Sequence, residues 1–363
     1  MTADPRILSQ LLIDWYAENA RRLPWRDDPK PYKVLLSELM LQQTRVETVI
    51  PYFHKFVKRW PTLPDLAAAT EDDVLEAWAG LGYYSRARNL HKCAKAAADS
   101  GLPTAPADLR KLPGIGPYTA GAIASIAFGE RAALVDGNVE RVLSRLDARR
   151  EDPRSKEGKK ALWSRAADLQ AAHDGHPGDL NQALMELGAT VCAPRKPRCD
   201  SCPVLSACEG RALGIETELP NKAKKKPPKP VFAVAGLLES GGEILFGKRP
   251  KGGLLGGLWE PIGADVDALD AGREAVHAAF VDCGLRVEVG ALRAEVVHVF
   301  THRRLTCRVY EISGFDGEVS VGSRYDDVRW STGEGLALSS LARKVLAAGC
   351  GQMRLPLAAD GEQ

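Results

Sequence analysis

Four cysteines in a short segment constrain this chain more than any other feature of its sequence. Within seventeen residues, six, two and five other residues separate the successive thiols of Cys192, Cys199, Cys202 and Cys208. Such a run can form disulfides, bind zinc or hold an iron-sulfur cluster. Disulfide frameworks are typical of small secreted chains, whereas this chain has 363 residues and no apolar leader at its start. We therefore expect metal binding in a reducing compartment.

The spacing of these thiols favours one metal group over another. Zinc sites commonly contain two close cysteine pairs, but here a single pair, Cys199 and Cys202, is separated by two residues. Iron-sulfur clusters use four thiolates at more varied spacings, so the spacing favours such a cluster, with zinc and unligated cysteines as alternatives. The scattered cysteines are expected to be small buried apolar side chains: Cys93, Cys283, Cys307 and Cys350.

A basic, proline-rich segment divides the chain into two parts. Residues 220–230 contain five lysines, four prolines and no acidic residue, although the net charge of the whole chain is only +2. Proline prevents a helix there, so we expect an extended linker at 221–230. No apolar run approaches the roughly eighteen residues needed to cross a bilayer, and we expect a soluble protein without membrane contact.

Hydrophobic periodicity changes at this linker. Upstream, apolar residues recur at intervals of three and four, which predicts about nine or ten helices. Downstream, short β-rich runs surround one helical stretch near 270–283, which indicates an α+β part. The β-rich runs are 231–238, 244–246, 295–300, 305–312 and 328–330.

Two glycines predict a tight turn between helices. Gly114 and Gly116 permit compact backbone geometry, and the helix after them begins with free amide groups that can bind phosphate. An ordinary helix-helix turn is the alternative. Twenty residues after Gly116, Asp136 stands where an apolar segment meets the next helix, a position that also suits a simple N-cap.

The glycine hairpin, the aspartate and the later cysteine cluster together resemble the helix-hairpin-helix DNA glycosylases of the endonuclease III superfamily. Within it, residues 37–44 resemble the catalytic segment of the adenine-specific enzymes of the MutY type, and the similarity extends through 23–26 and 81–86. The resemblance implies an all-α helix-hairpin-helix glycosylase domain with an iron-sulfur cluster loop, followed by an α+β Nudix-like domain. The implied boundaries are a glycosylase domain at 1–220 (a six-helix barrel at about 25–132 and a cluster module of 1–24 plus 133–220), a Lys/Pro linker at 221–230, a Nudix-like lesion-recognition domain at 231–350 and a tail at 351–363.

Two carboxylates are the candidate catalytic pair. Glu38 lies in the run 34–41, which is otherwise apolar apart from Ser37, so its carboxyl is expected in a partly dry pocket. Desolvation raises a carboxyl pKa, as a proton donor requires, although a position on the wet face of the helix is the alternative. The resemblance implies that Glu38 protonates a ring nitrogen of adenine and that Asp136 supports the positive sugar, while Asn138 and Tyr118 hold that centre and the attacking water.

Tyr118 also separates two classes of glycosylase. Enzymes of this superfamily that cut the strand place a lysine at this hairpin position, because a Schiff base needs an amine. A phenol cannot form an imine. We therefore predict a monofunctional enzyme that leaves an abasic site.

Other positions match residues that contact DNA in the family. Extruding a base requires side chains that fill the gap, and Gln42 and Tyr83 are the predicted wedges, with helix-end packing as the alternative for Tyr83 and its neighbour Tyr84. The family residues that contact the extruded adenine correspond to Trp25, Arg26 and Glu186. Gly114 and Gly116 are expected to contact the DNA backbone.

The resemblance implies a 4Fe-4S cluster held by the four cysteines as a structural and DNA-docking element. Hydrolysis of a glycosidic bond moves no electrons, so the metal is not needed for the chemistry. Three cations, Arg195, Lys196 and Arg198, lie between the first two cysteines and can neutralise phosphates or offset the charge of the cluster. A redox-sensing role stays open.

The second part resembles a Nudix domain at 256–261 and at Arg273-Glu274. Ala278 and Ala279 follow where a Nudix hydrolase has magnesium-binding glutamates, so pyrophosphatase activity is not expected. A family loop of the form Phe-Ser-His contacts oxidised guanine. Here the corresponding residues are Phe300, Thr301 and His302.

These observations predict removal of adenine mispaired with 8-oxoguanine or guanine from double-stranded DNA, in base excision repair. The alternatives are a related glycosylase acting on another mismatched or oxidised base, and a non-catalytic iron-sulfur protein that binds DNA or senses redox state. We expect a cytoplasmic, nucleoid-associated monomer that works before the enzymes that process abasic sites.

Overall fold

The computed structural model describes residues 4–223 and 227–349, which form two compact units. The first comprises Met1–Ala68 and Asn89–Lys224, and the second comprises Ala69–Arg88 and Lys225–Gln363. The predicted tail 351–363, Cys350 and the centre of the predicted linker lie outside the described residues. Within the described ranges, every helix is too short or too polar to cross a membrane.

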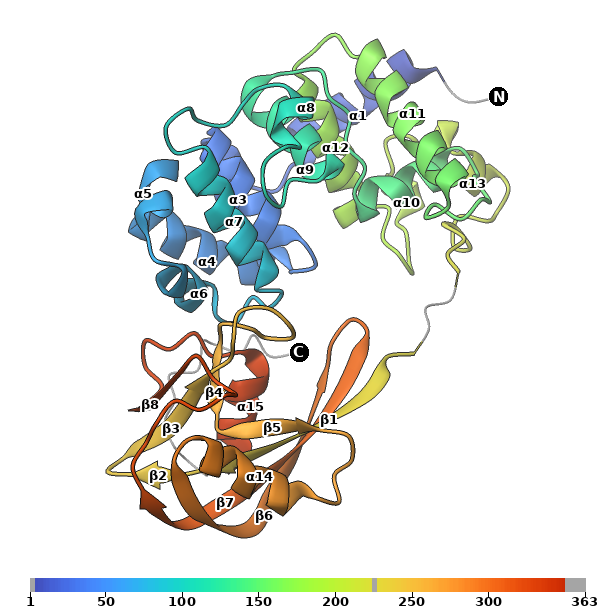
Figure 1. The fold of residues 1–363 in the computed structure, drawn as a ribbon. Coiled ribbons are helices and arrows are strands. Elements are labelled where there is room, and N and C mark those ends of the chain that lie inside the picture. The colour runs from blue at the N-terminus through green and yellow to red at the C-terminus, as the bar shows by residue number, and fades with distance from the viewer. Residues whose placement is uncertain (1–3, 224–226, 350–363) are drawn as a thin grey trace. The chain divides into compact units, whose positions relative to one another are not determined.

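The described sequence before the linker is helical (Figure 1). Its α-helices are α1 (Pro5–Asn19), α2 (Pro24–Asp27), α3 (Pro31–Leu41), α4 (Val46–Arg59), α5 (Leu63–Ala68), α6 (Glu71–Trp78), α7 (Ser85–Ala96), α8 (Pro106–Leu109), α9 (Pro117–Ala122), α10 (Gly137–Leu146), α11 (Lys156–Ala172), α12 (Pro177–Thr190) and α13 (Glu209–Ala212). A π-helical turn η1 (Ile123–Ala127) continues α9, and two 3-10 turns follow, η2 (Cys199–Ser201) and η3 (Leu205–Ala207). Three of the α-helices have four residues, too few for a periodic pattern to reveal.

Local sequence explains where several of these helices begin. Proline at the first helical position has no backbone N–H to leave unpaired, and its fixed φ suits the helix. It occupies that position in α1, α2, α3, α8, α9 and α12. Helix α10 instead begins with an aspartate N-cap, Asp136.

The helices that matter for the site pack closely in the first unit. Helix α3 contacts α4, α9 and η1, and α12 contacts α1, α10 and η1. Every residue of α3 from 34 to 40 is buried, so this helix lies within the core rather than on the surface. Such burial follows from its almost continuous apolar sequence.

The second unit contains two sheets. Its strands are β1 (Lys229–Leu237), β2 (Glu239–Ser240), β3 (Glu243–Lys248), β4 (Trp259–Pro261), β5 (Gly263–Val266), β6 (Leu285–Val299), β7 (Arg303–Gly317) and β8 (Asp327–Ser331). One sheet has the order β5-β1-β7-β6, and in the other β3 pairs with β2, β4 and β8. Strand β1 is parallel to β7, while the other strand pairs are antiparallel. Strand β1 begins at Lys229, two residues inside the predicted linker.

Two helices, α14 (Gly272–Asp282) and α15 (Ser340–Gly349), pack on these strands. Helix α14 inserts Val276 and Phe280 into a core that includes Leu245, Ile262 and Leu285. The predicted helix near 270–283 is therefore confirmed, and a strand lies at each of the five predicted β-rich runs. Strands β6 and β7, however, are much longer than the predicted runs 295–300 and 305–312. Strands β2, β4 and β5 were not predicted, because two to four residues carry no readable alternation. The ten-residue helix α15 was not predicted either.

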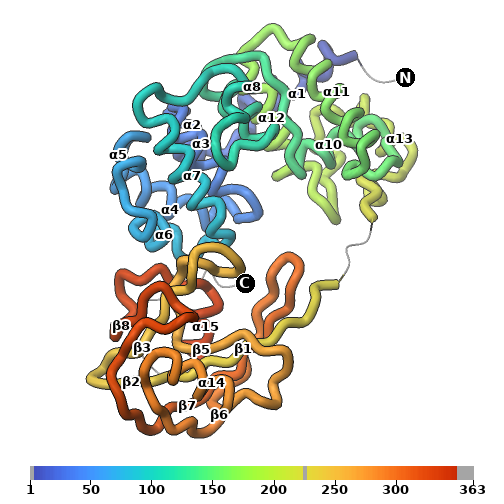
Figure 2. Tube along the Cα trace, in the orientation of Figure 1, coloured from blue at the N-terminus to red at the C-terminus, as the bar shows by residue number. Residues whose placement is uncertain are grey.

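Strands β6 and β7 form a long hairpin, seen in orange in Figure 2. Its pairing shifts register near Val289 and Leu292, and such irregularities bend a strand pair. The hairpin loop consists of residues 300–302, which are the predicted lesion-reading residues.

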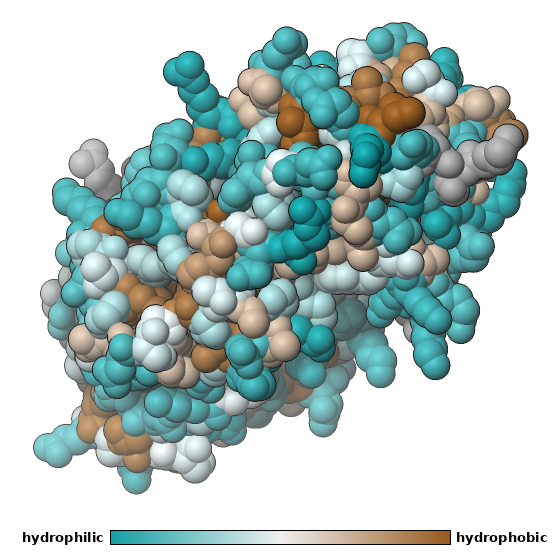
Figure 3. Space-filling model, turned by 90° about the horizontal axis from the view of Figure 1, so that it is seen from above, coloured by the Kyte–Doolittle hydropathy of each residue, from teal (hydrophilic) through white to brown (hydrophobic). Residues whose placement is uncertain are grey.

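The face of the molecule in Figure 3 is mainly polar. On the face drawn in Figure 3, hydrophilic side chains predominate and hydrophobic ones form small separate groups. Single exposed apolar side chains are normal for a folded protein.

Candidate active site

A pocket of about 630 Å³ lies in the first unit, among α2, α3, α9, α10 and α12. Its size is within the usual range for sites that bind small molecules. Eight residues proposed from the sequence line it: Trp25, Arg26, Glu38, Gln42, Tyr118, Asp136, Asn138 and Glu186. Tertiary structure thus brings together residues from five separate segments.

Glu38 is a buried acid on helix α3. Its side chain is 5% exposed, and it accepts a hydrogen bond from the phenol of Tyr118. Burial raises the pKa of Glu38 to about 7, against the opposing effect of the Tyr118 hydrogen bond, and the charge of Asp136 raises it further. The expectation that this carboxyl lies in a partly dry pocket is confirmed, and the wet-face alternative is wrong.

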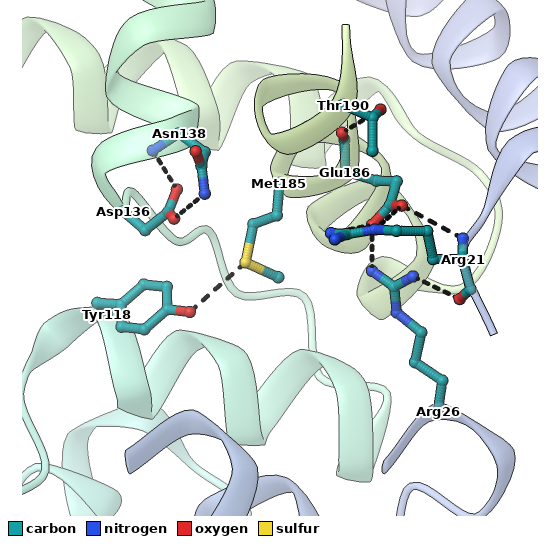
Figure 4. A network of polar contacts seen from close by, with 8 residues as sticks. All are labelled: Arg21, Arg26, Tyr118, Asp136, Asn138, Met185, Glu186 and Thr190. Atoms are coloured by element: carbon teal, nitrogen blue, oxygen red, sulfur yellow. Dashed lines mark hydrogen bonds and ion pairs between the residues drawn. The ribbon is translucent and has the colours of Figure 1, made fainter. Parts of the chain in front are cut away.

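Asp136 is held differently, at the N-terminus of α10. Its carboxylate accepts hydrogen bonds from the backbone N–H groups of Asn138 at 3.0 Å and Val139 at 2.7 Å, and from Nδ2 of Asn138 at 2.9 Å (Figure 4). Burial raises the pKa of Asp136, while these three donors favour the carboxylate and lower it. Asp136 is therefore both an N-cap and a pocket residue.

Glu186 lies on the other side of the network in Figure 4, across from Asp136 and Tyr118. It has no exposed surface, and its carboxylate pairs with Nε of Arg21 at 2.6 Å and Nη2 of Arg26 at 2.8 Å. Burial alone raises a carboxyl pKa, but the two guanidinium groups outweigh it and lower the pKa of Glu186. The indole of Trp25 packs edge-on against Phe53, with ring centroids 5.5 Å apart.

Sequence reasoning missed two lining residues. Arg21 pairs with Glu186, and Sδ of Met185 lies 3.5 Å from the Tyr118 hydroxyl, between the two groups of Figure 4. Arg21 lies five positions before Arg26, and Met185 directly precedes Glu186. Their closeness to predicted residues is the only signal that the sequence offered.

Gln42 and the glycine hairpin lie beside this pocket. Gln42 ends α3 and donates from Nε2 to Oγ1 of Thr119 at 3.4 Å. Gly114 has a φ of +77°, and a Cβ there would lie 2.5 Å from Cβ of Asn89. Gly116 caps α9 and has open space around its Cα, which leaves this backbone accessible.

The four clustered cysteines lie near the C-terminal end of the second segment of the first unit. All four thiols line one small cavity together with Arg145, and every cysteine that the structure describes is free. Nη1 of Arg145 lies 3.4 Å from Sγ of Cys192. Among the described residues, no group of three or more His, Cys, Asp or Glu side chains stands as the ligands of an ion would. The chemistry of the donor set, four thiols that line one cavity, nevertheless suits a group held by four thiolates.

One arginine links this cluster to the pocket. Arg141 donates from Nη2 to Oδ1 of Asn138 at 2.9 Å and from Nε to the carbonyl of Cys192 at 2.8 Å. It also donates to the carbonyl of Gly188 at 2.8 Å. Helix α10 thus connects the Asp136 end of the pocket to the first cysteine.

The remaining predicted residues lie in the second unit. Tyr83 is 45% exposed, and its hydroxyl lies 3.2 Å from Oγ1 of Thr301. Phe300 packs against His298 with ring centroids 4.6 Å apart, and His302 is exposed at the same hairpin tip. Tyr84, in contrast, is buried and donates to the carbonyl of Leu338, as the packing alternative requires. The other scattered cysteines that the structure describes, Cys93, Cys283 and Cys307, are buried as predicted.

Comparisons with known proteins agree with this architecture. Residues 36–167 match the family model of the HhH-GPD superfamily base excision DNA repair proteins, and residues 233–348 match that of the NUDIX domain. The all-α glycosylase domain and the following Nudix-like domain are therefore confirmed. Helix α14, in the second of these domains, contains Ala278 and Ala279, the two alanines noted in the sequence.

Curated relatives cover most of the chain. The adenine DNA glycosylase of Arabidopsis thaliana is 38% identical over 92% of this chain, which spans 63% of that relative's length. The human adenine DNA glycosylase is 37% identical over 92% of this chain and 72% of its own length. The corresponding rat protein is 35% identical over 94% of this chain and 78% of its own length.

A solved structure shares the helical fold. That of a thermostable thymine-DNA glycosylase superposes with a TM-score of 0.52 at 27% identity, covering 58% of this chain and 97% of the other.

Proposed function

The chain belongs to the family of adenine DNA glycosylases, and from this membership we propose that it removes adenine paired with 8-oxoguanine or guanine from duplex DNA in base excision repair. One observation carries the proposal. Glu38 and Asp136 line the same pocket, and the pKa of Glu38 is raised to about 7. A carboxyl that keeps its proton near neutral pH can serve as a general acid.

Glu38 is the proposed acid. It transfers its proton to a ring nitrogen of the everted adenine while the bond between the sugar C1′ and N9 breaks, so the base leaves without a negative charge. Tyr118 supports this step because its phenol orients the carboxyl through a hydrogen bond. Low exposure of Glu38 helps to keep bulk water from taking the proton.

Asp136 is the proposed partner of the positive sugar. Loss of adenine leaves an oxocarbenium-like centre, and a nearby carboxylate stabilises it by charge. Three hydrogen-bond donors hold the Asp136 carboxylate in place. Water then adds to C1′ and loses a proton, giving an abasic sugar, and Asn138 helps to hold this centre.

The Arg21–Glu186–Arg26 group is proposed to bind the adenine. Its charges are paired inside the protein before DNA arrives, so the group is already in position. Trp25 supplies an aromatic wall to the same pocket. Preorganised polar groups of this kind give selectivity for a base edge.

Gln42 and Tyr83 are the proposed wedges, and Phe300, Thr301 and His302 the proposed contacts with the opposite 8-oxoguanine. Support for Tyr83 comes from its half-exposed ring. Thr301 retains the hydroxyl of the family serine, and this hydroxyl lies beside that of Tyr83.

The cysteine cluster is the proposed site of a 4Fe-4S group. Cys192, Cys199, Cys202 and Cys208 would hold it, and its support is their shared cavity and free thiols. When bound, the group supplies structural cross-linking and electron-transfer capacity, neither of which the hydrolysis uses. Arg145 is placed to neutralise thiolate charge.

Single-turnover release of adenine tests the proposal. Duplexes carrying adenine opposite 8-oxoguanine, guanine or thymine are incubated with enzyme and then treated with alkali to reveal abasic sites. Release should be fastest opposite 8-oxoguanine, and Glu38→Gln should bind the duplex yet release little adenine. Release of thymine or of an oxidised pyrimidine instead would favour the related-glycosylase alternative.

Tyr118 in place of lysine supports a monofunctional reaction. Borohydride should not trap a protein–DNA adduct, and strand breaks should appear only after alkali. Efficient trapping with scission that keeps pace with base loss would contradict this assignment. The abasic product requires later processing by other enzymes, in the cytoplasm and at the nucleoid as we propose.

A further inference from the structure

The turn that presents Tyr83 is built around a buried arginine. Arg86 is 6% exposed, and its guanidinium carbon lies 5.3 Å from the ring centroid of Trp78 and 5.4 Å from that of Tyr83. A cation within about 6 Å of an aromatic face is attracted by the charge distribution of the ring. Arg86 therefore contacts both the buried ring of Trp78 and the half-exposed ring of Tyr83.

The same arginine holds the backbone before Tyr83. Its Nη2 donates to the carbonyl of Leu81 at 3.0 Å and to that of Gly82 at 3.2 Å. The indole N–H of Trp78 donates to the Gly82 carbonyl as well, at 3.1 Å. One carbonyl directly before Tyr83 is thus fixed by two different side chains.

The backbone of this turn has a conformation that needs such support. Gly80, Gly82 and Tyr83 have φ values of 112°, 68° and 48°. Glycine adopts positive φ freely, whereas a tyrosine there is strained and persists only where its surroundings hold it. Without its supports, Tyr83 would relax to an ordinary φ and redirect its ring.

We propose that Arg86 and Trp78 are positioning residues that hold the Tyr83 ring in the direction in which it enters duplex DNA. This inference rests on the proposed function, because it assumes that Tyr83 is a wedge. Burial lowers the pKa of Arg86 to about 10, which still leaves its charge in place at neutral pH. We call Trp78, Arg86 and the turn 80–83 the wedge platform.

A preorganised wedge improves binding because less ordering is required when DNA arrives. Loss of Arg86 should therefore weaken binding of lesion DNA by about tenfold, the order expected for one side chain that must be immobilised. The single-turnover rate at saturating protein should change by less than about twofold, because Arg86 does not line the pocket. A general structural defect would reduce both quantities.

A double-mutant comparison tests whether Arg86 acts through Tyr83. The probe is a duplex with 8-oxoguanine opposite a 2′-fluoro adenine nucleotide, which resists cleavage, and binding is followed by fluorescence anisotropy. Arg86→Ala and Tyr83→Ala should each weaken binding, and the double variant should bind no worse than Tyr83→Ala. Lys92→Ala, which removes an exposed cation from the same helix α7, is the matched control and should show an unchanged Tyr83→Ala effect. Additive losses for Arg86 and Tyr83 would overturn the inference.

Two milder variants cover the case in which Arg86→Ala does not fold, as judged by circular dichroism. Arg86→Lys keeps a cation but not the planar fork, and Trp78→Phe keeps a ring but loses the N–H donor. Each substitution should weaken DNA binding when Tyr83 is present. Neither should weaken it further in a protein that already carries Tyr83→Ala. Equal losses in the two backgrounds would overturn the wedge platform. Failure of the unaltered protein to prefer the lesion duplex or to release adenine would instead contradict the proposed function.

Discussion

The phenol of Tyr118 donates a hydrogen bond to Oε2 of Glu38, although the two residues stand 80 positions apart in sequence. This contact joins the helix that follows the glycine hairpin to the buried helix α3. The hydrogen bond also lowers the pKa of Glu38, opposite to the effect of burial, because a donor to a carboxylate favours the ionised form. The pKa of Glu38 thus reflects a balance between burial, which raises it, and the Tyr118 hydrogen bond, which lowers it, and single substitutions can shift that balance.

The rate of adenine release should fall as pH rises through about 7. Glu38 must hold a proton to act as an acid, and its pKa is about 7. Asp136 must be ionised, and burial raises its pKa above the ordinary value, so the rate should also fall at acidic pH. Single-turnover rates measured across pH check this bell shape. A rate that stays constant through pH 7 and above would remove Glu38 from the acid role.

Tyr118→Phe should move the alkaline limb of that profile to higher pH. The phenol hydrogen bond lowers the pKa of Glu38. Without it, the pKa-raising effect of burial is less opposed, so the pKa of Glu38 should rise further. Thr119→Ser, at the next position of the same helix and with its hydroxyl retained, is the control and should leave the limb unchanged. A limb displaced to lower pH would contradict the assigned effect of the hydrogen bond.

Glu38→Gln should stabilise the fold at alkaline pH. The folded pKa of about 7 exceeds the unfolded value of 4.5, so the folded state holds the proton more tightly. Stability from this group is fully present below pH 4.5 and is lost as pH rises through about 7, by roughly 3 kcal/mol in all. Glutamine does not titrate and avoids this loss.

Urea unfolding of the natural protein and of Glu38→Gln at pH 5 and pH 8 measures the effect. The free-energy advantage of the glutamine variant should grow with pH, whereas a variant at the exposed Glu18, Glu18→Gln, should show no such trend. An advantage that shrinks with pH would mean that Glu38 has a lowered folded pKa.

Arg26→Met should destabilise the first unit by roughly 2 kcal/mol, because it removes one of the two guanidinium partners of the completely buried Glu186 carboxylate, while Arg21 stays paired with it. Replacing both Arg21 and Arg26 by Met should cost more than the sum of the two single losses, because only then is the buried carboxylate uncompensated. Urea unfolding of the single and double variants tests both statements. A double variant whose loss is merely additive would show that the buried charge is not the cause.

Cys202→Ala should lower the iron content of the purified protein and its absorbance in the blue-violet. Cys93→Ala, which alters a buried cysteine far from the cluster in sequence, should leave both unchanged. Affinity for DNA should fall together with the iron content if the basic loop 195–198 depends on the cluster for its shape. Zinc in place of iron by elemental analysis would replace the 4Fe-4S proposal with the zinc alternative.

Local patterns in the sequence predicted the main elements of both halves. Apolar intervals of three and four marked the long helices, and β-branched runs marked the long strands, because these periods reflect which face of an element is buried. One-turn helices and strands of two to four residues escaped prediction, since a pattern cannot repeat within them. The resemblance of residues 37–44, the glycine hairpin and the cysteine spacing to one family supplied the chemistry.

Tertiary structure alone decided which side chains meet. Glu38, Tyr118, Asp136 and Glu186 come from four helical segments, and no local spacing sets the distance between them. The sequence determined that Glu38 belongs to an apolar run, but its exposure of 5%, and hence its raised pKa, depends on what packs against α3. The pairing of Arg21 with Glu186 and the strained φ of Tyr83 over Arg86 likewise depend on packing, because charge pairing and backbone strain follow from three-dimensional neighbours and not from sequence period.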